Sequence, residues 1–126
     1  MIAYSTPVTN VVIIANPAVK TSEISADDLR AVYLGMKTSL GDGSHLKPVL
    51  EKAGPVHDAF LKEYLRKTDF ALQTYYRSLV FSGAGSMPTT LPSDADVVAY
   101  VKKNREAIGY VAAGSVADGV KSLRVR

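Results

Sequence analysis

The sequence has 126 residues, of which 47% are hydrophobic and 21% are charged, and its formal net charge is +3. This length fits one domain that can bury a sufficient core, and the absence of cysteine excludes disulfides, thiolate catalysis and zinc–thiolate sites. The basic residues are scattered and form no aromatic-rich basic motif, so the composition argues against a nucleic-acid partner.

The first predicted element is a strand over residues 11–15. Residues 1–10 are expected to be an irregular lead-in to a single domain over 11–126. Val11-Val12-Ile13-Ile14-Ala15 contains only apolar residues, four of them β-branched, which is typical of a strand buried on both faces. Asn16-Pro17 should end the strand, because proline cannot continue a strand ladder. In a central strand, the carboxyl end is where a ligand would lie, which makes Asn16 a candidate contact.

A polar loop over residues 20–25 should lead into the first helix. Ser25 can cap this helix, with a favourable acidic residue, Asp28, in the first turn. Gly35 is expected to end it. Its apolar face would consist of Leu29, Val32 and Tyr33.

Gly41-Asp42-Gly43 predicts a tight turn, followed by a short strand over residues 46–50. Pro48 should place this strand at an edge of the sheet or make it irregular. Gly54-Pro55 predicts the start of a second helix, because proline suits the first turn. Lys67-Thr68-Asp69 should end that helix.

The third helix has the clearest pattern in the chain. It is expected to begin at Thr68 or Asp69 and to lead into a flexible loop over residues 82–86. Its apolar residues stand at helical spacing, namely Leu72, Tyr75, Tyr76, Leu79 and Val80. A fourth helix should begin at Ser93, with an apolar face of Val97, Val98 and Val101.

Two strands are predicted near the end of the chain, over residues 108–112 and 120–125, with a turn at Asp118-Gly119. Strands that alternate with helices indicate a single layered α/β domain, with a sheet flanked by helices. An antiparallel pairing of the last two strands would make this sheet mixed.

Two histidines are candidates for binding chemistry. His57 falls in the first turn of the second helix, where free N–H groups suit an anion, or it is a solvent-facing helix residue. His45 follows a glycine-rich turn and is expected to be exposed. No third ligand stands at a recognisable spacing, so no metal site is predicted.

The loop Ser82-Gly83-Ala84-Gly85-Ser86 can offer N–H groups to an anion, or it can simply link two helices. It lacks the Lys-Ser or Lys-Thr of a P-loop. No serine lies in a nucleophile-elbow sequence, and none of the twelve carboxylates lies in a catalytic signature. The sequence therefore predicts that the protein is not an enzyme and needs no cofactor.

A further signal lies in the segment Ile24 to Lys37 and in several shorter segments that follow it. Ile24 to Lys37 resembles the Ser-x-x-x-Leu-x-x-Ile-Phe-x-Gly-Lys helix in one lobe of the phosphate-type ABC-transporter substrate-binding proteins. The next family segments are similar to Gly41-Asp42-Gly43, Leu46 to Val49, Asp58 to Leu61, Leu79 to Gly83 and, most specifically, Ala107 to Val111. The resemblance covers about residues 11–125 and implies one lobe of a type 2 periplasmic binding protein.

The resemblance also implies where a ligand would bind. In the family, an arginine and a Ser-Gly-Thr sequence precede the helix that corresponds to the one containing Phe60 here. These family residues bind phosphate. Here Gly54, Pro55 and Val56 stand at the Ser-Gly-Thr positions, and only Lys52 could replace the arginine. The candidate contacts for an anion are Asn16, Lys52, Gly54, His57, Ser82, Gly83, Gly85 and Ser86.

The resemblance implies a non-enzymatic module that binds a small anion weakly and works with a membrane transporter or sensor. The alternative is an interaction protein in which the former ligand face mediates contact or homodimerisation. A periplasmic or otherwise exported location is expected, although residues 1–10 show no signal peptide. No apolar run is long enough to span a membrane.

Overall fold

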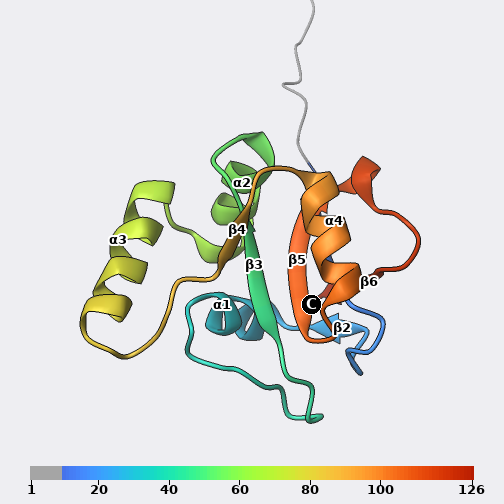
Figure 1. The fold of residues 1–126 in the computed structure, drawn as a ribbon, viewed down its shortest axis with the longest axis horizontal. Coiled ribbons are helices and arrows are strands. Elements are labelled where there is room, and N and C mark those ends of the chain that lie inside the picture. Colours follow the sequence, from blue (N-terminus) through green and yellow to red (C-terminus); the bar gives the residue numbers. More distant parts are fainter. Residues whose placement is uncertain (1–9) are drawn as a thin grey trace, which may run out of the picture.

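The computed structural model describes residues 10–126 (Figure 1), so the lead-in predicted over residues 1–10 lies, except for Asn10, outside the described residues. The strands are β1 (Val11–Ala15), β2 (Glu23–Ile24), β3 (Lys47–Glu51), β4 (Thr89–Leu91), β5 (Ala107–Ala112) and β6 (Lys121–Val125). The α-helices are α1 (Ala26–Tyr33), α2 (Pro55–Phe60), α3 (Asp69–Phe81) and α4 (Asp94–Lys103). A π-helical segment, η1 (Leu61–Leu65), continues α2, and a short 3-10 turn, η2 (Ala113–Ser115), follows β5.

The strands form one mixed sheet in the order β2-β6-β1-β5-β3-β4. Strand β1 runs antiparallel to both of its neighbours, β5 and β6, whereas β5, β3 and β4 run parallel to one another. The predicted α/β class and mixed sheet are confirmed. The suggested pairing of the last two strands is wrong, because β1 lies between β5 and β6.

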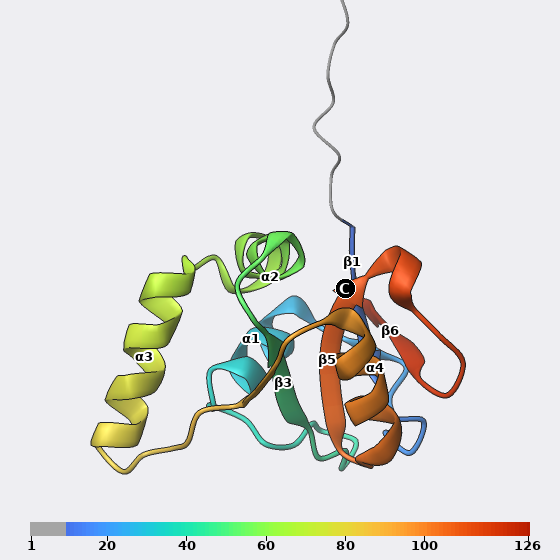
Figure 2. The ribbon, with the colours of Figure 1, turned by 45° about the horizontal axis from the view of Figure 1, so that its top comes forward.

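Helices cover both faces of the sheet, and each face has its own apolar core (Figure 2). Helix α4 packs on one face through Val97, Val98 and Val101. Helices α1 and α2, η1 and part of α3 lie on the other face. Strand β1 serves both cores, as predicted, because its side chains alternate: Ile14 faces α4, whereas Ile13 and Ala15 face the opposite way.

Strand β3 lies inside the sheet between β5 and β4, so of the two alternatives drawn from Pro48, an edge strand or an irregular strand, the edge position is wrong. The backbone N–H of Lys47 donates to Glu106 on the β5 side. Because successive residues of a strand point their N–H groups to opposite sides, the missing N–H of Pro48 falls on the β4 side. Pairing with β4 begins only at Val49, so no ladder bond is lost.

Local sequence signals placed the helix starts correctly. The side chains of Ser25, Thr68 and Ser93 cap α1, α3 and α4 by accepting backbone N–H groups in the first turn. Strands β2 and β4 were missed. The first has only two residues in a segment predicted to be loop, and the second has two exposed threonines, so neither shows the alternation of a strand.

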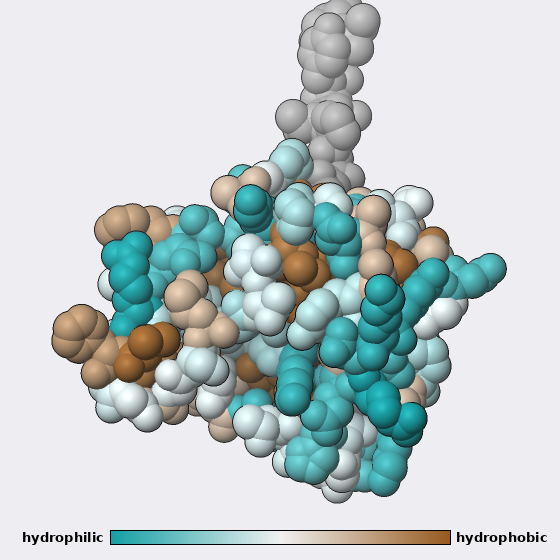
Figure 3. Space-filling model, in the orientation of Figure 1, coloured by the Kyte–Doolittle hydropathy of each residue, from teal (hydrophilic) through white to brown (hydrophobic). Residues whose placement is uncertain are grey.

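Helix α3 stands at one side of the molecule (Figure 1) and is attached through few residues. Leu72 and Tyr76 are its buried side chains, and the hydroxyls of Tyr75 and Tyr76 donate to carbonyls at the end of α1. Val80, predicted to face the core, is half exposed instead, because α3 meets the body along a narrow stripe. Figure 3 shows apolar residues gathered at the end of α3, where Phe81 is 94% exposed.

Replacing Gly109 with alanine is expected to lower the free energy of unfolding by about 1–3 kcal/mol. A Cβ at Gly109 would lie 2.8 Å from Cγ1 of Val97, so α4 could not keep its present distance from β5. Urea denaturation would measure the loss. Gly114→Ala is the matched control, because a Cβ there meets nothing within 4 Å; equal stability of the two variants would contradict this packing.

Candidate functional site

The carboxyl ends of β3, β4 and β5, at Glu51, Leu91 and Ala112, lie at one edge of the sheet, which we call the carboxyl edge. Ligands of open α/β sheets bind outside such an edge. Helix α2 begins close to Glu51, and the backbone N–H of Ala112 donates to Asp94 at the start of α4 (3.1 Å). The carboxyl edge is therefore the position to examine for binding chemistry.

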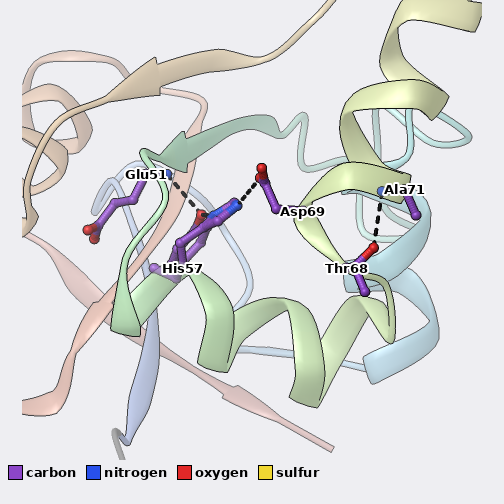
Figure 4. A network of polar contacts seen from close by, with 6 residues as sticks. Glu51, His57, Thr68, Asp69 and Ala71 are labelled. Atoms are coloured by element: carbon purple, nitrogen blue, oxygen red, sulfur yellow. Dashed lines mark hydrogen bonds and ion pairs between the residues drawn. The ribbon is translucent and has the colours of Figure 1, made fainter.

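His57 lies at this edge with both ring nitrogens engaged (Figure 4). Its Nδ1 is 2.6 Å from the Tyr110 hydroxyl, and its Nε2 is 2.8 Å from Oδ1 of Asp69, the first residue of α3. Its side chain is only 1% exposed. The solvent-facing alternative for His57 is therefore wrong, and the ring has no free nitrogen to offer an anion.

The contacts around Tyr110 assign the protons of this network. The backbone N–H of Glu51 donates to the Tyr110 hydroxyl oxygen (2.8 Å). Burial raises the pKa of Tyr110, so the hydroxyl keeps its proton, and His57 Nδ1 is the acceptor within reach. Nδ1 is then the nitrogen that accepts, and Nε2 donates to Asp69. The arrangement resembles a catalytic relay, but the fully buried Tyr110 cannot meet a substrate.

Glu51, which is buried, and Asp94, which is partly buried, form a second polar group at the carboxyl edge. The side chain of Glu51 points away from His57 (Figure 4) and belongs to the face covered by α4. Burial and the neighbouring carboxyl of Asp94 raise the pKa of Glu51 to about 8. Burial opposes ionisation of Asp94, but bonds from Glu51, Ser115 and the N–H of Ala112 lower its pKa.

One proton shared between these carboxyls accounts for two unpaired atoms. Oε2 of Glu51 and Oδ1 of Asp94 are buried, and neither has a partner if both are treated only as acceptors. A Glu51 side chain that keeps its proton at neutral pH can donate it to the Asp94 carboxylate, and such a bond would provide partners for these oxygens. The pair therefore keeps one negative charge at the carboxyl edge, where an anion would have to bind.

Asn16 lies at the opposite edge from Lys52, Gly54 and His57, because β1 runs against the other strands. Its amide Nδ2 donates to the carbonyls of Val101 and Lys102 at the end of α4, and its Oδ1 accepts the N–H of Ala18. The expectation that the end of β1 points to the same site is therefore wrong, and both amide hydrogens of Asn16 are used within the fold.

The loop that contains Ser82, Gly83, Gly85 and Ser86 lies beyond the far end of α3 and is also separate from the carboxyl edge. Its first N–H groups end the helix: Gly83 donates to Val80, and Ala84 donates to Leu79. This is a Schellman cap, which needs a left-handed residue, and Gly83 has φ +72°. The glycine signal for an anion loop is thus explained by helix capping.

Of the eight candidate contacts, only Lys52, Gly54 and His57 lie together, on the segment between β3 and α2. Lys52 is exposed, and its side chain is the one cation among them. The network residues Glu51, Asp69, Asp94 and Tyr110 were missed by sequence reasoning. The one local signal was an acidic residue directly after the apolar Val49-Leu50. Residues 10–126 contain no group of three or more metal-ligating side chains.

Solved structures that are described as phosphate transport or phosphate-binding proteins share this fold. An ABC-type phosphate transport receptor from Vibrio cholerae matches 91% of this chain with a TM-score of 0.62 at 17% identity. The chain has the fold of one lobe of a phosphate substrate-binding protein. PstS from Borrelia burgdorferi matches 92% of the chain with a TM-score of 0.69 at 14% identity. The chain spans less than half of these proteins, 45% and 47% respectively.

The lobe fold confirms the recognition made from sequence, and identities this low establish the fold alone. No protein-family model matches the chain, and no curated protein sequence is significantly similar to it. Within residues 10–126, no helix of the lobe combines the length and apolar character that crossing a bilayer requires.

Proposed function

We propose that this chain is a non-enzymatic binding module of the solute-binding-protein type, exported from the cytoplasm, that works beside a membrane transporter or sensor. The observation that carries this proposal is the lobe fold, which extends over 91% or more of the chain in structures of phosphate transport proteins. The buried network of His57 and Tyr110 supports the absence of catalysis, because the Tyr110 hydroxyl is inaccessible to a substrate.

Weak anion binding is part of this proposal, and its location is the segment from Lys52 to His57. Lys52 supplies the charge, and the backbone N–H groups after Pro55 supply donors. Three features limit the affinity: Pro55 has no N–H, His57 is engaged, and the Glu51–Asp94 pair is negative. Each charge-assisted hydrogen bond that is missing removes roughly 1.5–3 kcal/mol of binding free energy.

Titration calorimetry with phosphate and sulfate is expected to give a dissociation constant weaker than about 1 mM for the isolated chain. Lys52→Gln should abolish the remaining heat, because it removes the only cation at the segment. Lys62→Gln, an equal change of charge on η1, should have no effect. Micromolar phosphate binding, or binding that is insensitive to Lys52→Gln, would contradict this part of the proposal.

Export and partnership need a separate experiment. After expression of the natural gene, we expect the protein in the periplasmic or secreted fraction, and in vivo crosslinking should join it to a membrane transporter or sensor. A purely cytosolic location would sink the proposal, whatever the outcome of the phosphate titration.

The second candidate function is a protein-contact role for the carboxyl edge. It is favoured by the carboxyl pair Glu51–Asp94 and by the engaged His57, which lie where ligands of open α/β sheets bind and leave few free donors there. A homodimer could place two such edges opposite each other. Light scattering should then give twice the monomer mass. A charge reversal at Lys52 should return the measured mass to that of the monomer. A monomer mass at all protein concentrations rules out the dimer.

A further inference from the structure

A cavity of about 410 Å³ lies between α3 and the sheet, towards the amino ends of β3 and β4. It is therefore remote from the carboxyl edge. Its walls come from the end of α1, the start of β3, the last turns of α3 and residues 84–88. Pockets for small organic molecules occupy about 300–1,000 Å³, so this cavity is large enough for one.

The lining of this cavity is mainly apolar. Leu79 is central to it, because its Cδ1 lies 3.7 Å from where a Cβ would stand at both Gly35 and Gly85. These two glycines let the end of α1 and the loop close around Leu79. The other apolar walls include Leu46, Pro48, Met87 and Pro88. Such walls offer no substitute for the hydration shell of phosphate, and they suit an aliphatic or aromatic group.

Apolar surface also continues outside the cavity. Met36, which follows the lining residue Gly35, is 71% exposed, and Met87 itself is 44% exposed. Phe81, two residues after Leu79, is 94% exposed at the end of α3. A ligand with a chain longer than the cavity could therefore remain in contact with apolar side chains.

The charged lining residues of the cavity are both cationic: Lys37 and Lys47 contribute to it, and no aspartate or glutamate does. Lys37 is held by Asp28, with its Nζ 2.7 Å from Oδ1. Lys47 is freer, since its Nζ is 3.7 Å from Oε1 of Glu106 and its side chain is 79% exposed. This charge contrasts with the negative pair at the carboxyl edge and favours an anionic head group.

We propose that this cavity binds a small amphipathic carboxylate. The apolar part packs against Leu79 and Met87, and the carboxylate lies at Lys47, with the hydroxyls of Ser86 and Thr89 as further donors. The charge of the lysines disfavours a cationic amphiphile of the same length. The inference does not depend on the proposed transport role, because it uses none of the residues from Lys52 to His57.

The experiment follows amide chemical shifts of the full chain during titration with octanoate, below the concentration at which it forms micelles. We expect shifts at the amides of residues 35–38, 46–49 and 84–89, apart from Pro48 and Pro88, which have none, with a dissociation constant of about 0.1–1 mM. Acetate, which lacks the chain, should cause no shifts there. Octylammonium, which has the chain and the opposite charge, should bind at least about tenfold more weakly.

Two matched pairs of variants test the residues. Lys47→Glu should weaken octanoate binding at least about tenfold, whereas Lys62→Glu, the same change on η1, should leave it unchanged. Ser86→Trp, an exposed position on the cavity wall, should fill the cavity and abolish binding. Ser78 is an exposed residue of α3 that does not line the cavity, so Ser78→Trp should leave octanoate binding unchanged. Circular dichroism verifies that all four variants fold.

The proposal is overturned if octanoate leaves the cavity residues unshifted. It is overturned equally if octylammonium binds as well as octanoate, or if folded Lys47→Glu and Ser86→Trp bind like the unmodified chain. A dimer that is dissociated by Ser86→Trp, in a chain that does not bind octanoate, would show that a second copy covers the cavity.

Discussion

Replacing His57 with alanine is expected to lower the free energy of unfolding by about 3 kcal/mol. The substitution removes a ring that is 1% exposed, and it leaves the buried hydroxyl of Tyr110 without its acceptor. It also separates α2 from Asp69, so the start of α3 loses its polar link to the body. Chemical denaturation monitored by circular dichroism measures the change.

His45→Ala is the matched control for this prediction. His45 is exposed, so its removal should change the free energy of unfolding by less than about 0.5 kcal/mol. Tyr110→Phe keeps the ring and removes only the hydroxyl, and we expect an intermediate loss of about 1–2 kcal/mol. A loss below 1 kcal/mol for His57→Ala would mean that the network in Figure 4 does not hold α2 and α3 in place.

The stability of the domain is expected to fall as the pH rises from about 5 to 8.5. The pKa of Glu51 is about 8 in the folded chain, against an ordinary value of 4.5, so only the folded chain keeps this proton within that interval. Stability decreases with pH wherever the folded state binds more protons than the unfolded state, and it levels off above the folded pKa. At about 1.4 kcal/mol per pH unit as an upper limit, we expect a total fall of about 2–4 kcal/mol.

Glu51→Gln should remove this pH dependence, because the glutamine amide donates to Asp94 at every pH. The variant should therefore be more stable than the unmodified chain at pH 8.5. Glu63→Gln, at an exposed position of η1, should leave the decline intact. The lowered pKa values of Asp28, Asp42 and Asp94 act below pH 4 and do not interfere in this interval. A decline that survives in Glu51→Gln would refute the shared proton.

The His57 network and the Glu51–Asp94 pair also explain why the carboxyl edge differs from a phosphate-binding site. A helix start at the end of a strand is present, as in open α/β sheets that bind ligands. The side chains there, however, are bonded to one another: His57 to Tyr110 and Asp69, and Glu51 to Asp94. Preorganised donors with no partner of their own are what an anion needs, and here the side-chain donors other than the exposed Lys52 are already used.

The sequence by itself determined the local elements. The apolar run of β1, the caps at Ser25, Thr68 and Ser93, and the apolar faces of α1 and α4 could be predicted because each depends on residues within one or two turns. The α/β class and the resemblance to one lobe of the phosphate substrate-binding proteins rested on several such segments in order, and the comparison with solved structures confirms the class and the lobe fold.

Only the tertiary structure decided which residues meet. The direction of β1 depends on pairing with β5 and β6 near the end of the chain, and this pairing moves Asn16 to the edge opposite Lys52 and His57. The hydrogen bond between His57 and Tyr110, which are 53 residues apart in the sequence, likewise depends on the pairing of distant segments. Short edge strands such as β4 form because a neighbouring strand, here β3, offers hydrogen bonds to their backbone. The alternation of apolar and polar residues in such a strand does not predict it. Contacts of this kind are set by packing between distant segments, for which local periodicity contains no signal.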